Sequence, residues 1–227
     1  MRSKGAVKRK LKTVDRLLEK QYGTRKRRRK RVDPLDELIR TILSQNTNDK
    51  NRDRAYAAMR EAFPTWDDVM SAPRARLERV LKPGGLAKTK SARIQKILRS
   101  IAKSGELSLD YLRRLPTEEV EEALESFDGV GPKTTRCVLL FSLGREAFPI
   151  DTHIFRVLKR LGIVPSRMTA AKAHEYVPQF VAEGRSYALH LNIIAHGKAV
   201  CHARNPACDA CVIRKQCDYY ADVFTSS

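Results

Sequence analysis

The sequence has no run of about 20 apolar residues, and its N-terminus lacks the apolar core of a secretory signal. These absences argue against a membrane-spanning or secreted protein, so we expect a cytoplasmic one, associated with the nucleoid in a prokaryote. In such a reducing compartment, five cysteines favour metal binding or free thiols over disulfides. The alternating pattern of a strand is also missing, which favours an all-α fold.

Acidic residues are scarce beside basic ones. The chain has 26 Asp and Glu against 45 Lys and Arg, which gives a formal net charge of +19. Most of the excess lies in residues 1–31, which hold fifteen basic residues and two acidic ones. The run RKRRRKR, residues 25–31, cannot pack into a core, and its charge favours a polyanionic partner such as nucleic acid. A solubilising or targeting tail is the alternative.

Apolar residues recur at helical spacing through most of the chain. Residues 7–22 place them on one face and end at Gly23, while Asp33 and Pro34 open a helix whose apolar stripe reaches Leu43. Further short helices are predicted near residues 49–62, 65–71, 73–81, 87–104, 108–113 and 117–126. A chain of 227 residues can bury one large core or two small ones.

The stretch ESFDGVGPKTTRCVLL, residues 125–140, predicts a helix, a tight glycine hairpin and a second helix that begins at Pro132. Glycine allows close backbone approach, so we expect the amides of Val130, Gly131 and the helix N-terminus to point outward as a phosphate site. A purely structural turn between two helices is the alternative. Cys137, on the buried face of the second helix, is predicted to be a core residue.

Lys133 follows the hairpin directly, on the first turn of a helix, where the helix dipole repels a cation. A lysine in this place can form a Schiff base with a sugar aldehyde, or it can simply contact a phosphate. Asp151, within FPIDTHIFRVLKRLG, is predicted to cap the next helix. Its carboxylate could also deprotonate the lysine or stabilise a cationic sugar intermediate.

Four of the five cysteines lie within seventeen residues near the C-terminus, separated by six, two and five residues. They are Cys201, Cys208, Cys211 and Cys217. Four thiols so close together predict a metal centre, and both zinc and iron–sulfur clusters accept all-cysteine ligation. Zinc sites usually show two C-x2-C pairs, whereas this stretch has one, so the spacing favours a [4Fe–4S] cluster.

Together, FDGVGPKTT, PIDTHIFRVLKR and C-x6-C-x2-C-x5-C resemble the endonuclease III family of DNA glycosylases, in the helix-hairpin-helix superfamily. The likeness covers roughly residues 34–217 and includes LIRTILSQNTND, GGLAKTKSARI and IIAHGKAVC. It implies an all-α, two-domain helix-hairpin-helix DNA glycosylase fold. A six-helix barrel domain is expected at 34–145 and a [4Fe–4S] cluster domain at 146–227. Residues 1–33 are expected to form a basic arm and a helix that packs with the cluster domain.

The resemblance also implies roles for single residues. Lys133 looks like the family's catalytic lysine, which attacks the anomeric carbon, and Asp151 looks like its assisting aspartate. Asn46 stands where the family places a residue that fills the gap left by a flipped nucleotide, and Leu86 matches its wedge. The remaining expected DNA contacts are Gly129, Val130, Gly131 and Thr134. The four clustered cysteines match the ligands of the family's [4Fe–4S] cofactor.

The implied function is that of a base-excision-repair DNA glycosylase with abasic-site (β-elimination) lyase activity, which removes oxidised pyrimidines through a Schiff base on Lys133. The implied partner is double-stranded DNA containing damaged bases or abasic sites, bound by a monomer without a membrane. One alternative is a monofunctional or mismatch-directed (thymine or adenine) glycosylase, which the presence of Lys133 disfavours. Another is a catalytically silent DNA-damage-binding protein, which Lys133 and Asp151 together disfavour. One departure from the family pattern is Phe127-Asp128, which replaces Leu-Pro and brings an anion close to Lys133.

Overall fold

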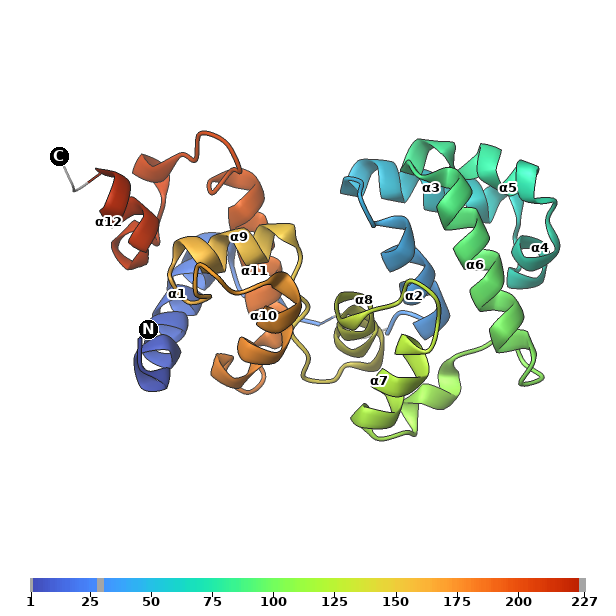
Figure 1. Cartoon of the computed structure of the whole chain (residues 1–227), viewed down its shortest axis with the longest axis horizontal. Coiled ribbons are helices and arrows are strands. Elements are labelled where there is room, and N and C mark those ends of the chain that lie inside the picture. The colour runs from blue at the N-terminus through green and yellow to red at the C-terminus, as the bar shows by residue number, and fades with distance from the viewer. Residues whose placement is uncertain (1, 28–30, 225–227) are drawn as a thin grey trace. The chain divides into compact units, whose positions relative to one another are not determined.

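The computed structural model describes residues 2–27 and 31–224 of the chain. All regular structure in these residues is helical, which confirms the predicted all-α fold (Figure 1). No helix of this described part is long and apolar enough to cross a membrane. The chain divides into two compact units: unit 1 comprises residues 1–30 and 145–227, and unit 2 comprises residues 31–144.

Unit 2 is a series of short helices joined by tight turns. Its α-helices are α2 (Pro34–Leu43), α3 (Asp49–Ala62), α4 (Trp66–Ser71), α5 (Arg74–Leu81), α6 (Ala87–Ala102), α7 (Thr117–Glu125) and α8 (Pro132–Cys137). Two 3-10 segments and a π-helical segment accompany them: η1 (Lys82–Gly84), η2 (Asp110–Arg113) and η3 (Val138–Leu143).

Helix α2 forms much of the core of unit 2. As predicted, the Asp33 side chain caps it by accepting the Asp36 N–H at 2.9 Å, and Pro34 occupies its first turn. Its apolar stripe is buried, and α2 packs against α3, α6, α8 and η3. The helix therefore links the hairpin that precedes α8 to the opposite side of unit 2.

Two predicted helices differ from those observed. Near residues 108–113 only the 3-10 segment η2 forms, because few residues separate it from Pro116, which disfavours a helix before it. The second helix of the hairpin leaves the α-helical path after Cys137 and continues as π-helical η3 to Gly144. Arginine side chains bind the carbonyls at its end, since Arg113 and Arg31 donate to Ser142 O and Leu143 O.

Unit 1 brings both ends of the chain together. Its helices are α1 (Lys4–Tyr22), α9 (Thr152–Arg160), α10 (Ala170–Tyr176), α11 (Ser186–Ala199) and α12 (Asp218–Phe224), with the 3-10 segments η4 (Pro178–Phe180), η5 (Cys208–Ala210) and η6 (Arg214–Gln216). Helix α11 packs against both α1 and α9 (Figure 1). Their apolar side chains share one buried core, to which α1 contributes Val7, Leu11, Val14 and Leu18.

The N-terminal helix α1 ends as its sequence predicts, at Gly23, which adopts a positive φ of 83°. Its two acidic residues point inward, where Arg185 donates to Asp15 at 2.7 Å and to Glu19 at 3.0 Å. The lysines and arginines of α1 are mostly exposed. Arg28, Arg29 and Lys30, in the middle of the predicted basic run, lie outside the described residues.

Candidate DNA-lesion site and cysteine centre

The glycine hairpin between α7 and α8 contains two glycines that serve different purposes. Gly129 has a φ of 73°, in the left-handed region that other residues adopt only with strain, so the local backbone favours glycine there. Gly131 has an ordinary extended backbone, and a Cβ there would meet nothing within 4 Å. The fold therefore does not require glycine at 131, and the backbone there is open.

The backbone amides of the hairpin only partly match the prediction. The Gly131 and Lys133 N–H groups have no acceptor among the residues that the structure describes. The expectation that the Val130 amide points outward is wrong, because its N–H closes a turn by donating to Phe127 O at 3.0 Å. Thr134 is buried, and its N–H donates to Gly131 O. The open donors therefore lie at Gly131 and on the first turn of α8, a suitable place for an anion.

Lys133 stands beside these open amides. Its side chain is half-buried, and Nζ lies 3.4 Å from the Ser44 hydroxyl, just after the end of α2. Asp128, the unusual anion of the hairpin, instead pairs with Lys96 at 3.3 Å on the surface. Lys133 forms no ion pair with any described residue, so its amine is held near the hairpin only by a long hydrogen bond.

Glu37 lies in the same region and was missed by the sequence reasoning. It is on α2, one turn before Thr41, whose hydroxyl donates to its carboxylate at 3.2 Å. Burial raises the pKa of Glu37 to about 7, although Thr41 and the nearby cations Arg40, Lys133 and Arg52 act in the opposite direction. The sequence signal was an acidic residue inside the otherwise apolar stripe of α2.

Two exposed loops of unit 2 hold the predicted duplex-inserting residues. Asn46, just after α2, and Leu86, just before α6, have φ values of 52° and 49°, in the left-handed region that non-glycine residues seldom adopt. Leu86 is 54% exposed, which is unusual for a leucine. Backbone strain and apolar exposure coincide at Leu86, a combination that favours a functional role over a packing role.

A hydrogen-bond network that was not predicted connects the Asn46 loop to the hairpin. The Gln45 side chain accepts from Arg93 Nη1 at 2.7 Å and donates to Gly129 O at 3.2 Å. The loop of Asn46, helix α6 and the hairpin are therefore held together within unit 2. No sequence pattern points to this network, since its members are 36 or more residues apart.

Asp151 belongs to unit 1 and caps α9, as predicted. Its carboxylate accepts the Ile154 N–H at 2.7 Å, and the apolar residues that follow, among them Val157 and Leu158, are buried. The cap holds the carboxylate in a fixed orientation. Its predicted role toward Lys133 stays a prediction.

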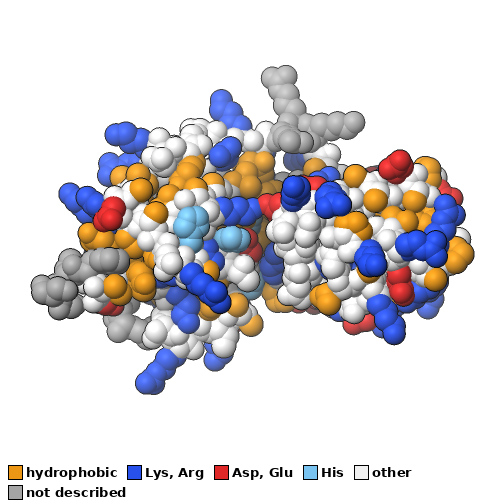
Figure 2. All heavy atoms as spheres, turned by 90° about the horizontal axis from the view of Figure 1, so that it is seen from above, with side chains coloured by type: hydrophobic (Ala, Val, Ile, Leu, Met, Phe, Trp, Pro, Cys, Tyr) orange, Lys and Arg blue, Asp and Glu red, His pale blue; other side chains and the backbone are white. Residues whose placement is uncertain are grey.

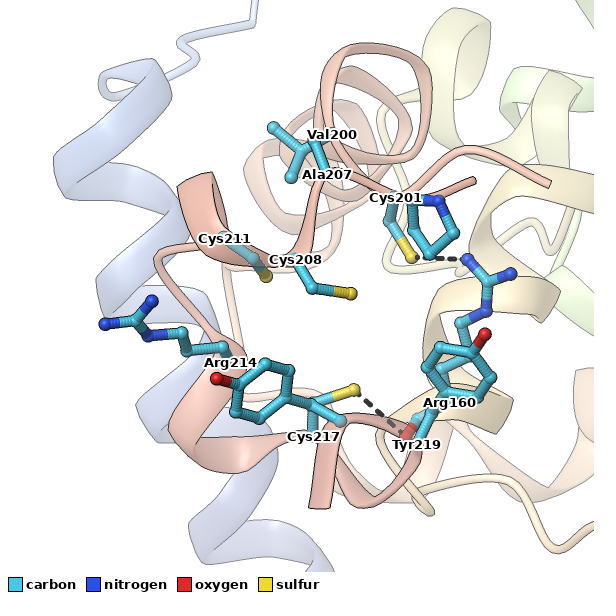
Figure 3. A pocket seen from close by; sticks show the side chains of 11 residues that line it. Arg160, Val200, Cys201, Ala207, Cys208, Cys211, Arg214, Cys217 and Tyr219 are labelled. Carbon is cyan, nitrogen blue, oxygen red and sulfur yellow. Dashed lines mark hydrogen bonds between the residues drawn. The ribbon is translucent and has the colours of Figure 1, made fainter. Parts of the chain in front are cut away.

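The four clustered cysteines line one pocket in unit 1. Figure 3 shows their side chains around a common open space, and Cys201 and Cys217 lie on facing sides of that space. Arg160 borders this space and lies 3.2 Å from Cys201 Sγ through Nη1. Burial raises the pKa of the Cys211 thiol to about 11, so a bound metal must displace a proton there.

The donor set of the pocket fits a metal centre. The four cysteines line one space, and all-thiolate ligation suits both zinc and iron–sulfur clusters. Their spacing, with one C-x2-C pair, favours a [4Fe–4S] cluster.

Residues around the cysteines were not predicted. His196, on α11, is buried with Nε2 3.5 Å from Cys211 Sγ and Nδ1 3.0 Å from the Tyr22 hydroxyl. Burial lowers the pKa of His196 to about 4, so its ring is neutral at neutral pH. Through Tyr22, the N-terminal helix contacts the surroundings of the cysteine pocket.

Two protein-family models match the chain. One, described as the HhH-GPD superfamily of base excision DNA repair proteins, matches residues 39–182, more than half of the chain. The other, the iron–sulfur binding domain of endonuclease III, matches residues 201–217 and therefore includes all four clustered cysteines. The second match confirms the predicted iron–sulfur cofactor.

Comparisons with individual known proteins agree with these two matches. Endonuclease III of Sulfolobus acidocaldarius is 33% identical over 187 residues, which cover 82% of this chain and 82% of that protein. An Arabidopsis thaliana protein named for a DNA glycosylase is 41% identical over 165 residues, which cover 72% of this chain and only 56% of that protein. A solved structure of a trapped endonuclease III–DNA covalent intermediate shares the fold, with a TM-score of 0.79 at 23% identity over 98% of this chain and 99% of the other.

Proposed function

Because the chain belongs to the endonuclease III family, within the HhH-GPD superfamily of base excision DNA repair proteins, we propose that it is a bifunctional enzyme. It removes an oxidised pyrimidine from duplex DNA and then cleaves the strand at the resulting abasic site. The observation that carries this proposal is the placement of Lys133 beside the open amides of Gly131 and the first turn of α8. An anion-binding backbone with an amine next to it is suited to a sugar-phosphate.

The chemistry follows from an amine nucleophile. The neutral Nζ of Lys133 attacks C1′ of the damaged nucleotide. The glycosidic bond between C1′ and the base nitrogen breaks, and the electron pair of that bond and a proton go to the departing base. Ring opening gives a Schiff base, which acidifies the hydrogen at C2′. Loss of that proton expels the 3′ phosphate, and water then hydrolyses the imine to free Lys133. No oxidant or reductant is needed.

Other residues of the chain support these steps in the proposal. The amides at Gly131 and the start of α8 hold the DNA phosphate, while Leu86 and Asn46 occupy the duplex when the damaged nucleotide leaves it. Asp151 acts as the assisting carboxylate toward the cationic sugar. The four cysteines would hold a [4Fe–4S] cluster, which would cross-link the loop of residues 201–217 when bound.

The surface charge supports DNA as the partner of a monomeric enzyme. Figure 2 shows many Lys and Arg side chains and fewer acidic ones on the face that it presents. On α1 the exposed cations include Lys8, Lys12, Arg16 and Lys20, whereas both acidic residues of the helix are bonded to Arg185. In this proposal the basic N-terminal region adds affinity that depends on salt but not on sequence.

Borohydride trapping tests the proposed function. The wild type, Lys133→Gln and the control Lys103→Gln, which changes an exposed lysine of unit 2, are each mixed with a thymine glycol duplex and an abasic duplex. We expect the wild type and the control to form a covalent adduct on both duplexes. Lys133→Gln should lose the adduct by at least about 10³-fold, because it removes the nucleophile.

The other outcomes separate the alternatives. Trapping on the abasic duplex alone would keep Lys133 as the lyase nucleophile and exclude thymine glycol as the base substrate. Binding without trapping on either duplex would overturn the proposal in favour of a monofunctional glycosylase or a silent damage-binding protein.

A further inference from the structure

Lys90 is a buried charge without a counter-charge. It lies in the first turns of α6, is 1% exposed, and is among the largest fully buried side chains of the described residues. Its ammonium forms no ion pair with them, and burial lowers its pKa. Placing an ammonium in the interior is costly unless its hydrogen-bonding partners are well arranged. A fold that needed only volume here could use methionine or leucine.

The two partners of Lys90 explain why the charge is kept. Nζ donates to Leu43 O and to Gly84 O, each at 2.8 Å. Leu43 is the last residue of α2, and Gly84 is the last residue of η1, so both carbonyls lie at helix ends where regular helical donors run out. One cation thus caps two helix ends that are 41 residues apart in sequence.

From each capped helix end, the chain runs directly into one of the two loops that hold a residue with a positive φ, Asn46 or Leu86. Asn46 follows Leu43 by three residues, and Leu86 follows Gly84 by two. The Lys90 amide also donates to Leu86 O at 2.9 Å, so Lys90 holds the wedge loop through both backbone and side chain. A residue in the left-handed region keeps that conformation only where its surroundings fix it.

We propose that Lys90 is a positioning residue that sets the Asn46 and Leu86 loops together, so that the gap filler and the wedge enter the duplex as one unit. The inference rests on the proposed function, since it assigns Lys90 to the extrusion of the damaged nucleotide. The ammonium is suited to this task because its donors reach two carbonyls at once, which no apolar side chain can do. Lys90 itself touches no DNA in this account.

A purely structural lysine would affect every activity of the enzyme to the same degree, whereas a positioning lysine affects extrusion selectively. Lys90→Met keeps the unbranched apolar part of the side chain, ends one atom earlier, and removes the Nζ that donates both hydrogen bonds. The control Lys103→Met makes the same exchange at an exposed position just after α6. Thermal melting of both variants establishes that the protein is folded before DNA is added.

The test uses a thymine glycol duplex with 2-aminopurine beside the lesion, and an abasic duplex in which no base has to be extruded. The rise in 2-aminopurine fluorescence reports extrusion, and borohydride trapping on the abasic duplex reports Lys133 chemistry. We expect Lys90→Met to slow extrusion by roughly 10²-fold, the scale of a displacement of about 1 Å, and to leave abasic trapping within about threefold. Lys103→Met should change neither.

A double-variant cycle identifies the route. If Lys90 acts through Leu86 as well as Asn46, then the loss of extrusion in the Lys90→Met, Leu86→Ala double variant should be smaller than the sum of the two single losses, because the losses of coupled residues are not additive. Independent, additive losses, or equal losses on both duplexes, would overturn the proposal. If wild-type protein fails to trap abasic DNA, the proposed function fails instead, whatever Lys90 does.

A second variant covers the case in which Lys90→Met does not fold. In Gly84→Ala, the new Cβ would lie 2.9 Å from Ala55 Cβ, so helix α3 or the backbone at Gly84, whose carbonyl Lys90 binds, must shift while Lys90 is unchanged. We expect the same selective loss of extrusion. Wild-type extrusion by a folded Gly84→Ala protein would contradict the proposal.

Discussion

Units 1 and 2 use their charged residues in opposite ways. In unit 1, Arg185 pairs with Asp15 and Glu19, and Asp218 pairs with Arg2 and Lys10, so that ion pairs join segments more than 160 residues apart. In unit 2, most ion pairs are exposed or local in sequence, while the fully buried Lys90 has no ion-pair partner among the described residues.

This difference in ion pairing indicates that the charges of unit 1 mainly stabilise the fold, whereas some charges of unit 2 are available for binding or catalysis. Unit 1 closes the two ends of the chain around a shared core and a cysteine pocket, and its charges hold that closure. Unit 2 carries Lys133, Glu37 and Lys90, none of which forms an ion pair with a described residue. Charges kept in such surroundings are more often functional than stabilising.

The largest effect is expected from the cysteine pocket. Cys211→Ser should lose iron and the broad visible absorbance of a brown protein, and should destabilise unit 1 by several kcal/mol, because metal binding and folding are coupled. The control Cys137→Ser, in unit 2, should retain iron. Iron-to-protein ratios and absorbance spectra check both variants. A colourless wild type with stoichiometric zinc would contradict the assignment.

The next effect concerns the ion pairs of unit 1. Arg185→Gln leaves the buried Asp15 without its partner, and we expect it to lower the free energy of unfolding by about 1–3 kcal/mol at neutral pH. Arg185 also holds the pKa of Glu19 below its ordinary value. The stability that Arg185 provides through Glu19 is therefore present above the ordinary pKa of Glu19, and it is lost as the pH falls through the lowered pKa.

Urea unfolding at pH 7 and at acidic pH checks this prediction. The difference between Arg185→Gln and the wild type should shrink as the Glu19 carboxylate becomes protonated. A difference that is the same at both pH values would mean that Arg185 acts through packing alone.

A smaller effect of opposite sign is expected in unit 2. The folded-state pKa of Glu37 is raised to about 7, so its contribution to stability is full below its ordinary pKa and is lost as pH rises through 7. Glu37→Gln should therefore be more stable than the wild type above pH 7, by about 1–2 kcal/mol after allowance for partial exposure. The exposed Glu106→Gln serves as the control in pH-dependent melting. Equal stability of Glu37→Gln and the wild type at pH 8 would refute this interpretation.

The smallest effect on stability is expected at Gly131. Gly131→Ala should melt like the wild type, because the new methyl group meets nothing, yet it should bind DNA roughly tenfold more weakly by crowding the phosphate. Gly129→Ala should instead lower the melting temperature, because the φ of 73° at this position strains any residue with a Cβ. Fluorescence anisotropy and melting curves separate the two variants. Undiminished DNA binding by Gly131→Ala would remove the phosphate site from the account.

Features set by neighbouring residues could be predicted from the sequence. The caps at Asp33 and Asp151, the end of α1 at Gly23 and the cysteine spacing all depend on a few adjacent positions. The Val130 amide was misjudged because its partner, Phe127 O, is fixed by the particular turn that forms. Sequence patterns show that a turn exists more readily than they show which bonds it makes.

Features set by distant contacts could not be predicted. Lys90 reads as one more lysine in a basic segment until folding brings Leu43 O and Gly84 O to its ammonium. The bonds that join Gln45, Arg93 and Gly129 likewise depend on tertiary packing. The site therefore contains residues whose type is common and whose surroundings alone make them unusual.

The most direct test of the central claim is to identify the residue that becomes attached to DNA. After borohydride trapping of the wild type on an abasic duplex, proteolysis and peptide mass spectrometry locate the modified side chain. The account predicts a single secondary amine at Lys133. Modification of another lysine or of the N-terminal amine, with Lys133 unmodified, would contradict it.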